Sequence, residues 1–201
     1  MDSAVHIREA RQPGDLGWVI MAHGESYARE FGWDTSFEAL VARIVADYAG
    51  ARDPVREAGW IAELDGRRVG CVFCVAKDET TAQLRILLVD SAARGRGAGR
   101  LLVDECIRFA RRAGYRRMVL WTNDPLKSAA RIYRAAGFRL TAEAPHHSFG
   151  ADLVGQNYEL DLAVPSPADG PAQPVRSRSP KAPTHEPDET YRDRRDADVG
   201  G

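Results

Sequence analysis

The sequence predicts an α+β domain with a mixed, mostly antiparallel central sheet and helices on both of its faces. Short apolar runs of strand length cluster in the middle of the chain. Segments with helical periodicity precede and follow these runs, and a glycine-rich loop separates the central strand from the next helix. This order of elements favours an α+β fold over a regular alternation of strands and helices.

The first elements are a strand and two helices. Residues 5–8 form a short opening strand. Asp15 is expected to cap the first helix, whose apolar side chains keep to one side. Thr35 or Ser36 is expected to cap the second helix, which keeps a period of 3.6 residues and ends near Gly50.

A β-hairpin and the central strand come next. Residues 60–64 and 68–76 flank Asp65-Gly66, a pair that suits a two-residue turn. Residues 77–80 form a second turn into the central strand, residues 82–89. Because these strands follow one another through short turns, they are expected to be antiparallel.

After the glycine-rich loop, the pattern is helix, strand, helix and two strands. Gly114 is placed to end the first of these helices, and residues 118–122 form the strand after it. The second helix ends at Gly137, and residues 138–142 and 156–162 form the last two strands. Apolar and polar residues alternate in the final strand, which indicates one buried and one exposed face.

Composition places the chain among soluble globular proteins and divides it in two. The chain has 201 residues, of which 44% are hydrophobic and 28% are charged. We expect residues 1–163 to form the domain, and residues 164–201, rich in Pro, Ser, Arg and Asp, to form a disordered tail. A cytoplasmic protein is expected, because no apolar run is long enough to span a membrane and no secretory signal opens the chain.

The charge balance and the cysteines argue against several classes of protein. A net charge of −1 gives no case for nucleic acid or a membrane as a partner. Cys71 and Cys74 are three residues apart in a strand and therefore face opposite sides, which argues against a redox or metal pair. With Cys106 they are expected in the core, and no metal is expected. The sequence leaves open whether the protein is a homodimer.

The glycine-rich loop predicts a phosphate-binding site. Its three glycines remove side chains at the start of a helix, so the unpaired backbone N–H groups there can turn inward together. The positive end of the helix dipole and the neighbouring arginines favour an anion at the same place. We expect a pyrophosphate to be held by Arg94, Gly95, Arg96, Gly97, Ala98, Gly99 and Arg100.

The spacing of this loop excludes two common nucleotide-binding motifs. A P-loop needs a Lys-Ser/Thr pair at the start of the helix, and none is present. A dinucleotide fingerprint needs Gly-x-Gly-x-x-Gly, whereas Gly95-Arg-Gly97-Ala-Gly99 has a shorter last gap. A flexible Gly/Arg turn is the alternative to a binding loop.

Two segments resemble the GNAT superfamily of acyl-CoA-dependent N-acetyltransferases. Arg94-Gly-Arg-Gly97-Ala-Gly99 resembles its Arg/Gln-x-x-Gly-x-Gly/Ala signature. Residues 129–138 resemble its second hallmark, a helix that carries a tyrosine and ends at Gly-Phe. The resemblance covers roughly residues 4–162. Residues 23–27 and 120–122 look most like the acetyltransferase half of proteins fused to a MarR-type regulator, although no winged-helix segment is present.

The resemblance implies an enzyme that transfers an acetyl group from acetyl-CoA to a primary amine of a small molecule, amino acid or peptide. The amine is expected to attack directly in a ternary complex, because core cysteines offer no activated nucleophile. The resemblance also implies that the end of the central strand, at Leu87, Leu88 and Val89, bulges and meets the pantetheine arm. A backbone N–H near Leu88 is then the expected oxyanion donor.

The resemblance places a hydroxyl and an amide beside the thioester. Tyr133 is expected to protonate the leaving thiolate or to hydrogen-bond to it. Its alternative is a core position in which the hydroxyl bonds to the backbone. The common family pattern has an asparagine seven residues before this tyrosine, where this chain has Leu126. Asn123 or Ser128 is the alternative contact to the pantetheine.

The general base departs from the simplest family pattern. Some members carry a glutamate eleven residues before the first loop residue, and this chain has Gln83 there, which cannot accept a proton. Deprotonation must then use a water chain, another side chain or an amine that arrives neutral. The candidate side chains are Glu30, Glu63, Glu79, His146 and His147, the histidines lying on the loop before the last strand.

The acceptor site is expected beside the central strand. Alternation places Arg85 on the same face as Gln83, where its guanidinium suits an acceptor with a carboxylate. A surface arginine paired with an acid is equally consistent. The resemblance places further acceptor residues at the junction of the first two helices, although an aromatic junction also suits a plain core. The expected acceptor residues are Tyr27, Glu30, Trp33, Gln83, Arg85 and His146.

Two other functional classes are alternatives. A binding module that keeps the loop but has lost turnover is an acyl-CoA sensor, which is consistent with Gln83 in place of the glutamate. A DNA-binding regulator needs a helix-turn-helix or a basic stripe, and the sequence has neither.

Overall fold

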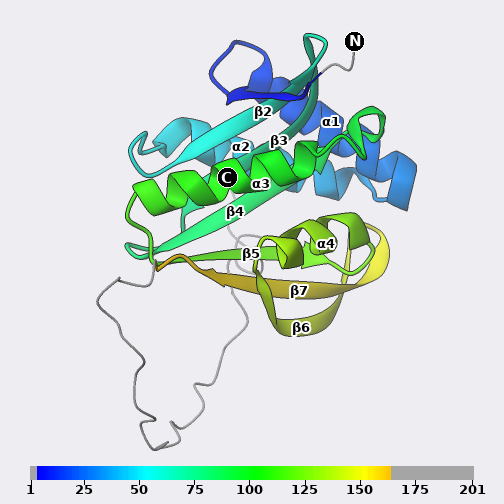
Figure 1. Ribbon diagram of the computed structural model, residues 1–201. Coiled ribbons are helices and arrows are strands. Elements are labelled where there is room, and N and C mark those ends of the chain that lie inside the picture. Colours follow the sequence, from blue (N-terminus) through cyan, green and yellow to red (C-terminus); the bar gives the residue numbers. More distant parts are fainter. Residues whose placement is uncertain (1–3, 164–201) are drawn as a thin grey trace, which may run out of the picture. The chain divides into compact units, whose positions relative to one another are not determined.

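The computed structural model describes residues 4–163, so the predicted tail at residues 164–201 lies outside the described residues. Seven strands form one sheet in the order β1-β2-β3-β4-β5-β7-β6 (Figure 1). Neighbouring strands are antiparallel except β4 and β5, which are parallel. The elements are β1 His6–Glu9, α1 Asp15–Phe31, α2 Thr35–Ala51, β2 Ala58–Leu64, β3 Arg67–Ala76, β4 Thr81–Val89, the 3-10 helix η1 Ser91–Ala93, α3 Ala98–Arg112, β5 Arg117–Asn123, α4 Lys127–Ala135, β6 Arg139–Ser148 and β7 Ala151–Asp161.

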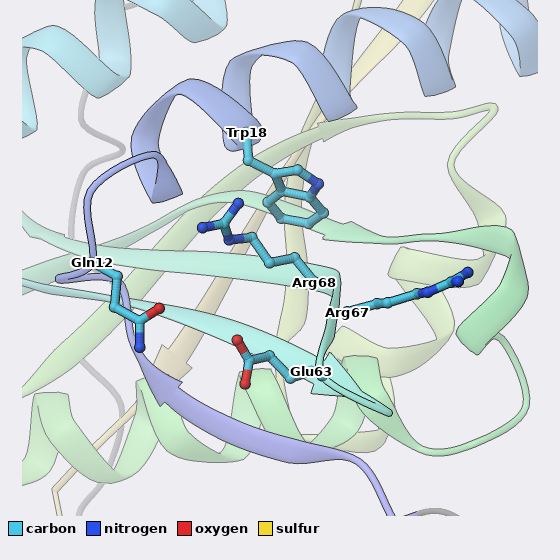
Figure 2. A pocket seen from close by; sticks show the side chains of 6 residues that line it. Gln12, Trp18, Glu63, Arg67 and Arg68 are labelled. Carbon is cyan, nitrogen blue, oxygen red and sulfur yellow. The ribbon is translucent and has the colours of Figure 1, made fainter.

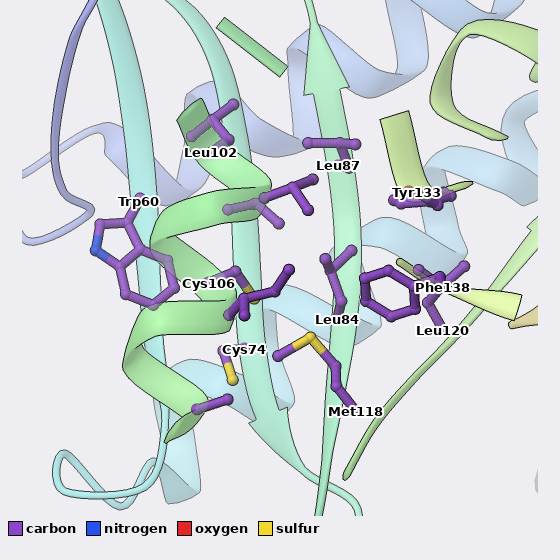
Figure 3. Close-up of a cluster of buried hydrophobic side chains, with 14 of the residues drawn as sticks. Trp60, Cys74, Leu84, Leu87, Leu102, Cys106, Met118, Leu120, Tyr133 and Phe138 are labelled. Carbon is purple, nitrogen blue, oxygen red and sulfur yellow. The ribbon is translucent and has the colours of Figure 1, made fainter. Parts of the chain in front are cut away.

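Two helices cover each face of the sheet, which confirms the predicted class. In Figure 1, α3 and α4 lie in front of the sheet, and α1 and α2 lie behind it. Each face of the sheet has its own hydrophobic core, and successive side chains of β3 alternate between the two. Cys71 and Phe73 pack in the cluster beneath α1 and α2, whereas Val72 and Cys74 pack in the cluster beneath α3. Figure 3 shows the cluster beneath α3, in which this helix lies against the strands. Within residues 4–163 no helix is long and apolar enough to cross a membrane.

Both predicted helix caps were wrong. Asp15 lies inside the first turn of α1, and Gly14, in the left-handed region at φ 87°, is the cap residue. The fully buried Asp15 carboxylate instead accepts hydrogen bonds from Arg8 and Arg68. Asp34 caps α2 by accepting from the Ser36 amide at 2.9 Å. The Asp15 carboxylate thus binds two arginines instead of the helix start, and the cap of α2 lies one residue before the predicted ones.

The last hairpin is longer than predicted. β6 and β7 extend to a two-residue turn at Phe149 and Gly150, whose φ angles are 59° and 75°. The predicted loop that carries His146 and His147 is therefore part of β6. The edge strand β6 is exposed along most of its length, so it lacks the alternating apolar pattern that reveals a strand.

The central strand β4 contains a bulge and separates from β5. Arg85 pairs with Phe73, but Leu88 pairs with Cys71, so one extra residue is accommodated in β4. Ile86 lies at this bulge with φ 46°. Pairing with β5 stops at Gln83, after which β4 and β5 run apart (Figure 1). We call the opening between the two diverging strands the split.

Candidate active site

The loop between β4 and α3 presents unpaired amides at a helix start. Gly95 and Gly97 adopt φ angles of 79° and 78°, which side-chain-bearing residues rarely adopt. Gly97 caps α3 without a side-chain hydrogen bond, and the first bond of the helix runs from the Leu101 amide to the Gly97 carbonyl. In the described part of the chain, the amides of residues 98–100 have no acceptor. They are positioned to bind an anion.

The three glycines of the loop have different physical roles. A Cβ on Gly95 or Gly97 would meet no atom within 4 Å, so the space around them is open. A Cβ on Gly99 would lie 2.6 Å from Ile132 Cδ1, so this glycine allows α3 to approach α4. Open space, unpaired amides and left-handed backbone together fit a diphosphate.

The amide of Val89 faces the split. The Asp90 amide donates to the Val69 carbonyl at 2.8 Å, and Leu88, two residues earlier, faces Cys71 of β3 in the same orientation. Since successive residues of a strand direct their amides to opposite sides, Val89 directs its N–H away from β3. Of the amides near Leu88, that of Val89 is therefore the one directed toward the split.

Tyr133 packs in the core beside the split, and its hydroxyl has no hydrogen-bond partner among residues 4–163. The side chain is 4% exposed, and its ring contacts Phe138 and Tyr158. Figure 3 shows Tyr133 close to Phe138 and Leu120. Burial raises the pKa of Tyr133, and nearby Tyr27 adds to this shift. The hydroxyl is therefore neutral and not engaged by the backbone, unlike that of an ordinary core tyrosine.

Tyr27 approaches the split from the opposite face of the sheet. It lies on α1 among Trp33 and Phe37, with ring centroids 5.1 and 4.5 Å away. Burial raises the pKa of Tyr27, and the Cys71 thiol and the Glu30 carboxylate raise it further. The separation of β4 from β5 thus lets one tyrosine from each helical layer lie near the same opening.

Asn123 and His146 meet at the end of β5. His146 Nε2 lies 2.8 Å from Asn123 Oδ1, and His146 Nδ1 lies 3.0 Å from the Ser148 hydroxyl. Asn123 is 2% exposed. The position at which the family pattern has its asparagine is occupied by Leu126 in this chain. Sequence reasoning placed these two residues in separate roles, and the structure brings them into direct contact.

Glu30 is paired with the first residue of the glycine loop. Both of its carboxylate oxygens lie 2.6 Å from an Arg94 guanidinium nitrogen. Two expected site residues, one assigned to the acceptor and one to the diphosphate, are therefore partners of each other.

Arg85 and Gln83 lie together on β4. Arg85 Nη1 donates to Gln83 Oε1 at 3.2 Å, and both side chains are half-buried. They are on the face of β4 that α1 and α2 cover, next to the point where β5 separates. The expected juxtaposition of these residues is therefore present.

Trp33 lies in the core. It is 3% exposed and packs with Phe149 and Leu153 in a cluster at the end of α1. The Asp34 amide donates to the Phe149 carbonyl, which fixes the β6–β7 turn on this cluster. The alternative of a plain aromatic core therefore describes Trp33 better than an acceptor contact does.

Several further candidates have partners elsewhere. Glu63 accepts from Arg8 at 2.7 Å near β1, and Glu79 lies in the turn before β4, at the end of that strand far from the loop. His147 is exposed and contacts Asp152. Ser128 lies at the exposed start of α4 next to Arg131, while Arg96 and Arg100 are exposed and Arg100 pairs with Asp104.

Sequence reasoning assigned no role to His23, a buried histidine beneath the bulge. It is 1% exposed, and its Nδ1 lies 2.8 Å from the Val19 carbonyl. Its Nε2 is buried without a hydrogen-bond partner in the described chain, and the Ile86 backbone lies nearby. Burial lowers the pKa of His23 to about 4, so the ring is neutral. A helix-face histidine gives no signal of this kind before the fold is known.

One cavity lies away from the split. It has a volume of about 450 Å³ and lies between α1 and the β2–β3 hairpin. Figure 2 shows Trp18 above the Arg68 side chain, with Glu63 on the neighbouring strand. Its lining includes no residue of β4 or of the glycine loop.

A sheet that splits beside a glycine-rich helix start defines the acyl-CoA N-acyltransferase class of α+β folds. Residues 21–138 match the Acetyltransferase (GNAT) family. An uncharacterized N-acetyltransferase of Schizosaccharomyces pombe is 30% identical over 166 residues, covering 79% of this chain and 96% of that protein. The chain belongs to the Acetyltransferase (GNAT) family.

Other known proteins share part of the sequence or the fold. The N-acetylaspartate synthetase of Danio rerio is 33% identical over 96 residues, covering 47% of this chain. The chain spans only 34% of that protein and 41% of human N-acetyltransferase 8B, which is 36% identical over 93 residues and 44% of this chain. A putative acetyltransferase from Salmonella typhimurium, solved with its cofactor acetyl-CoA, has a TM-score of 0.66 at 22% identity, covering 84% of this chain and 99% of that one.

Proposed function

We propose that the protein transfers an acetyl group from acetyl-CoA to the primary amine of an acceptor that carries a carboxylate, such as an amino acid or a peptide. One observation carries the proposal: β4 and β5 separate after Gln83, and the opening leads toward the unpaired amides at the start of α3. An elongated ligand with a diphosphate at one end and a thioester at the other suits this arrangement. Acetyl-CoA supplies the acetyl group as a thioester.

The protein groups have separate tasks in this proposal. The amides of residues 98–100 hold the diphosphate, and the Val89 amide donates to the thioester carbonyl oxygen, where negative charge develops. The Tyr133 hydroxyl gives its proton to the thiolate that leaves. Because burial raises the pKa of Tyr133, the hydroxyl retains this proton at neutral pH.

Direct attack by the amine is favoured over a covalent enzyme intermediate. Cys71, Cys74 and Cys106 are all buried, and burial raises the pKa of the Cys71 thiol. An accessible thiolate is therefore lacking among these residues. In direct attack, the amine nitrogen bonds to the carbonyl carbon, the C–S bond breaks, and the amine loses a proton. Of the candidate bases, Glu30 and His146 are supported by their contacts, which join Glu30 to Arg94 and His146 to Asn123.

Arg85 is the proposed anchor for the acceptor's carboxylate. A guanidinium binds a carboxylate through two parallel hydrogen bonds, and Arg85 lies on the strand where the split begins. The name of the N-acetylaspartate synthetase that this chain resembles points to an amino-acid product, which supports an acceptor of this class. The acceptor amine is then held near the thioester carbon.

A turnover screen tests the proposal. Purified protein is mixed with acetyl-CoA and panels of amino acids, peptides, polyamines and aminoglycosides, and both free thiol and acetylated product are measured. We expect acceptor-dependent thiol release with at least one carboxylate-bearing amine. Binding of acetyl-CoA without thiol release for any amine would contradict the enzyme and favour an acyl-CoA sensor.

A further inference from the structure

The Glu30–Arg94 pair joins the two halves of the proposed site. Glu30 lies in the last turn of α1, next to the aromatic cluster of the α1–α2 junction, and Arg94 is the first residue of the glycine loop. One guanidinium nitrogen lies 2.6 Å from each carboxylate oxygen. The side chains are 22% and 51% exposed, so a ligand can reach both partners.

A diphosphate on the loop competes with Glu30 for Arg94. The diphosphate carries at least two negative charges. When it is bound by the amides at the start of α3, it lies in the same loop as Arg94. A guanidinium binds phosphate as well as carboxylate. Because the pair is partly exposed, exchange of Glu30 for the diphosphate costs little. Loss of Arg94 leaves the Glu30 carboxylate without its present counter-ion.

On the basis of the proposed function, we propose that Glu30 binds the ammonium group of the acceptor and that Arg94 masks it until CoA draws the guanidinium away. Without CoA the pair is neutral and offers no net charge to an amine. With CoA bound, Glu30 presents a negative charge on the α1 side of the site, while Arg85 presents a positive charge on β4. An amino acid has an ammonium group that can bind Glu30 and a carboxylate that can bind Arg85.

This exchange makes the two ligands cooperative. Binding of CoA raises the affinity for the acceptor, and by linkage the acceptor raises the affinity for CoA equally. Glu30→Gln removes the carboxylate that competes with the diphosphate for Arg94. It also removes the negative charge that binds the acceptor's ammonium group. The substitution should therefore tighten CoA binding and weaken acceptor binding. If Glu30 only stabilised the fold, its substitution would not change the affinities for CoA and for the acceptor in opposite directions.

Calorimetric titration with CoA tests the first half of this inference. We expect Glu30→Gln to bind CoA about two- to five-fold more tightly than the wild type at low salt, with a smaller difference at high salt. Glu25→Gln, on an exposed position of the same helix, is the matched control and should leave the affinity unchanged. In an Arg94→Gln background, Glu30→Gln should have no effect on CoA binding. Equal or weaker CoA binding by Glu30→Gln overturns the inference.

Steady-state kinetics with the best acceptor from the screen tests the second half. We expect Glu30→Gln to lower the KM for acetyl-CoA and to raise the KM for the acceptor by about five-fold or more. An unchanged acceptor KM overturns the proposed role of Glu30. If wild type and all variants fail to bind CoA, the proposed function itself fails. If the proteins bind CoA but the binding of CoA and of the acceptor are not coupled, this inference is contradicted and the proposed function is not.

Discussion

His146 donates from Nε2 to Asn123 Oδ1 across 2.8 Å, and this contact orients both side chains. An amide oxygen can only accept, so Nε2 is the donor in this contact, and Nδ1 lies 3.0 Å from the Ser148 hydroxyl. The Asn123 carboxamide is thereby oriented, and its NH2 group has no hydrogen-bond partner within residues 4–163. A buried, oriented donor at the end of β5 is suited to a polar group of the pantetheine arm.

Asn123→Ala should raise the KM for acetyl-CoA by about two- to ten-fold, because one hydrogen bond to the ligand is lost. Ser148→Ala should give a smaller increase in the same direction, since it removes the hydroxyl that fixes the His146 ring. His147→Ala, on the exposed neighbour in β6, is the control. Initial rates at varied acetyl-CoA measure the effect. Equal KM values for all four proteins would remove Asn123 from the site.

Tyr133→Phe should lower kcat by about 100-fold or more and leave the KM for acetyl-CoA nearly unchanged, because the thiolate loses its proton donor. The hydroxyl has no partner in the described chain, so thermal stability should be retained. Tyr158→Phe, on the ring next to Tyr133, is the matched control for loss of a hydroxyl. Full turnover by Tyr133→Phe at saturating substrate would show that it is a core residue only.

Arg85→Ala should raise the KM for a carboxylate-bearing acceptor by about ten-fold or more, since a charge-assisted hydrogen bond is lost. The same substitution should not affect the KM for the corresponding amide, which has no carboxylate to bind. Comparison of one amino acid with its amide in wild type and variant measures this interaction directly. A similar loss for both acceptors would indicate that Arg85 supports the strand.

Stability should fall as the pH falls from about 6.5 to about 4, partly because of His23. Burial lowers the pKa of this residue from 6.5 to about 4 in the native protein. Between these values the unfolded chain takes up a proton that the native chain does not, which lowers the free energy of unfolding by up to about 3 kcal/mol. In urea unfolding at several pH values, His23→Phe should flatten this dependence. The same slope in both proteins would contradict neutral burial of His23.

The glycine loop and the order of elements could be predicted because their signals are local. Gly95 and Gly97 require backbone angles that other residues disfavour, and the strand and helix beside them have clear periodicity. The Asp65-Gly66 turn is equally local, and both residues have positive φ as a type I′ turn requires. Such features follow from a few neighbouring residues.

The contacts within the site depend on residues far apart in the sequence. Glu30 and Arg94 are 64 positions apart, and Asn123 and His146 are 23 positions apart. The sequence indicated each residue as a candidate but not the pairs, because side-chain partners are set by how the helices dock on the sheet. For the same reason the sequence could not show that Trp33 packs with Phe149 and Leu153.

Calorimetric titration of the wild-type protein with CoA and with 4′-phosphopantetheine tests most directly whether the loop amides bind a diphosphate. We predict saturable binding of CoA, binding of phosphopantetheine weaker by about ten-fold or more, and a loss of about ten-fold in CoA affinity for Gly97→Ala, whose left-handed backbone becomes strained. Absence of CoA binding, or equal affinity for the two ligands with no effect of Gly97→Ala, would contradict the account.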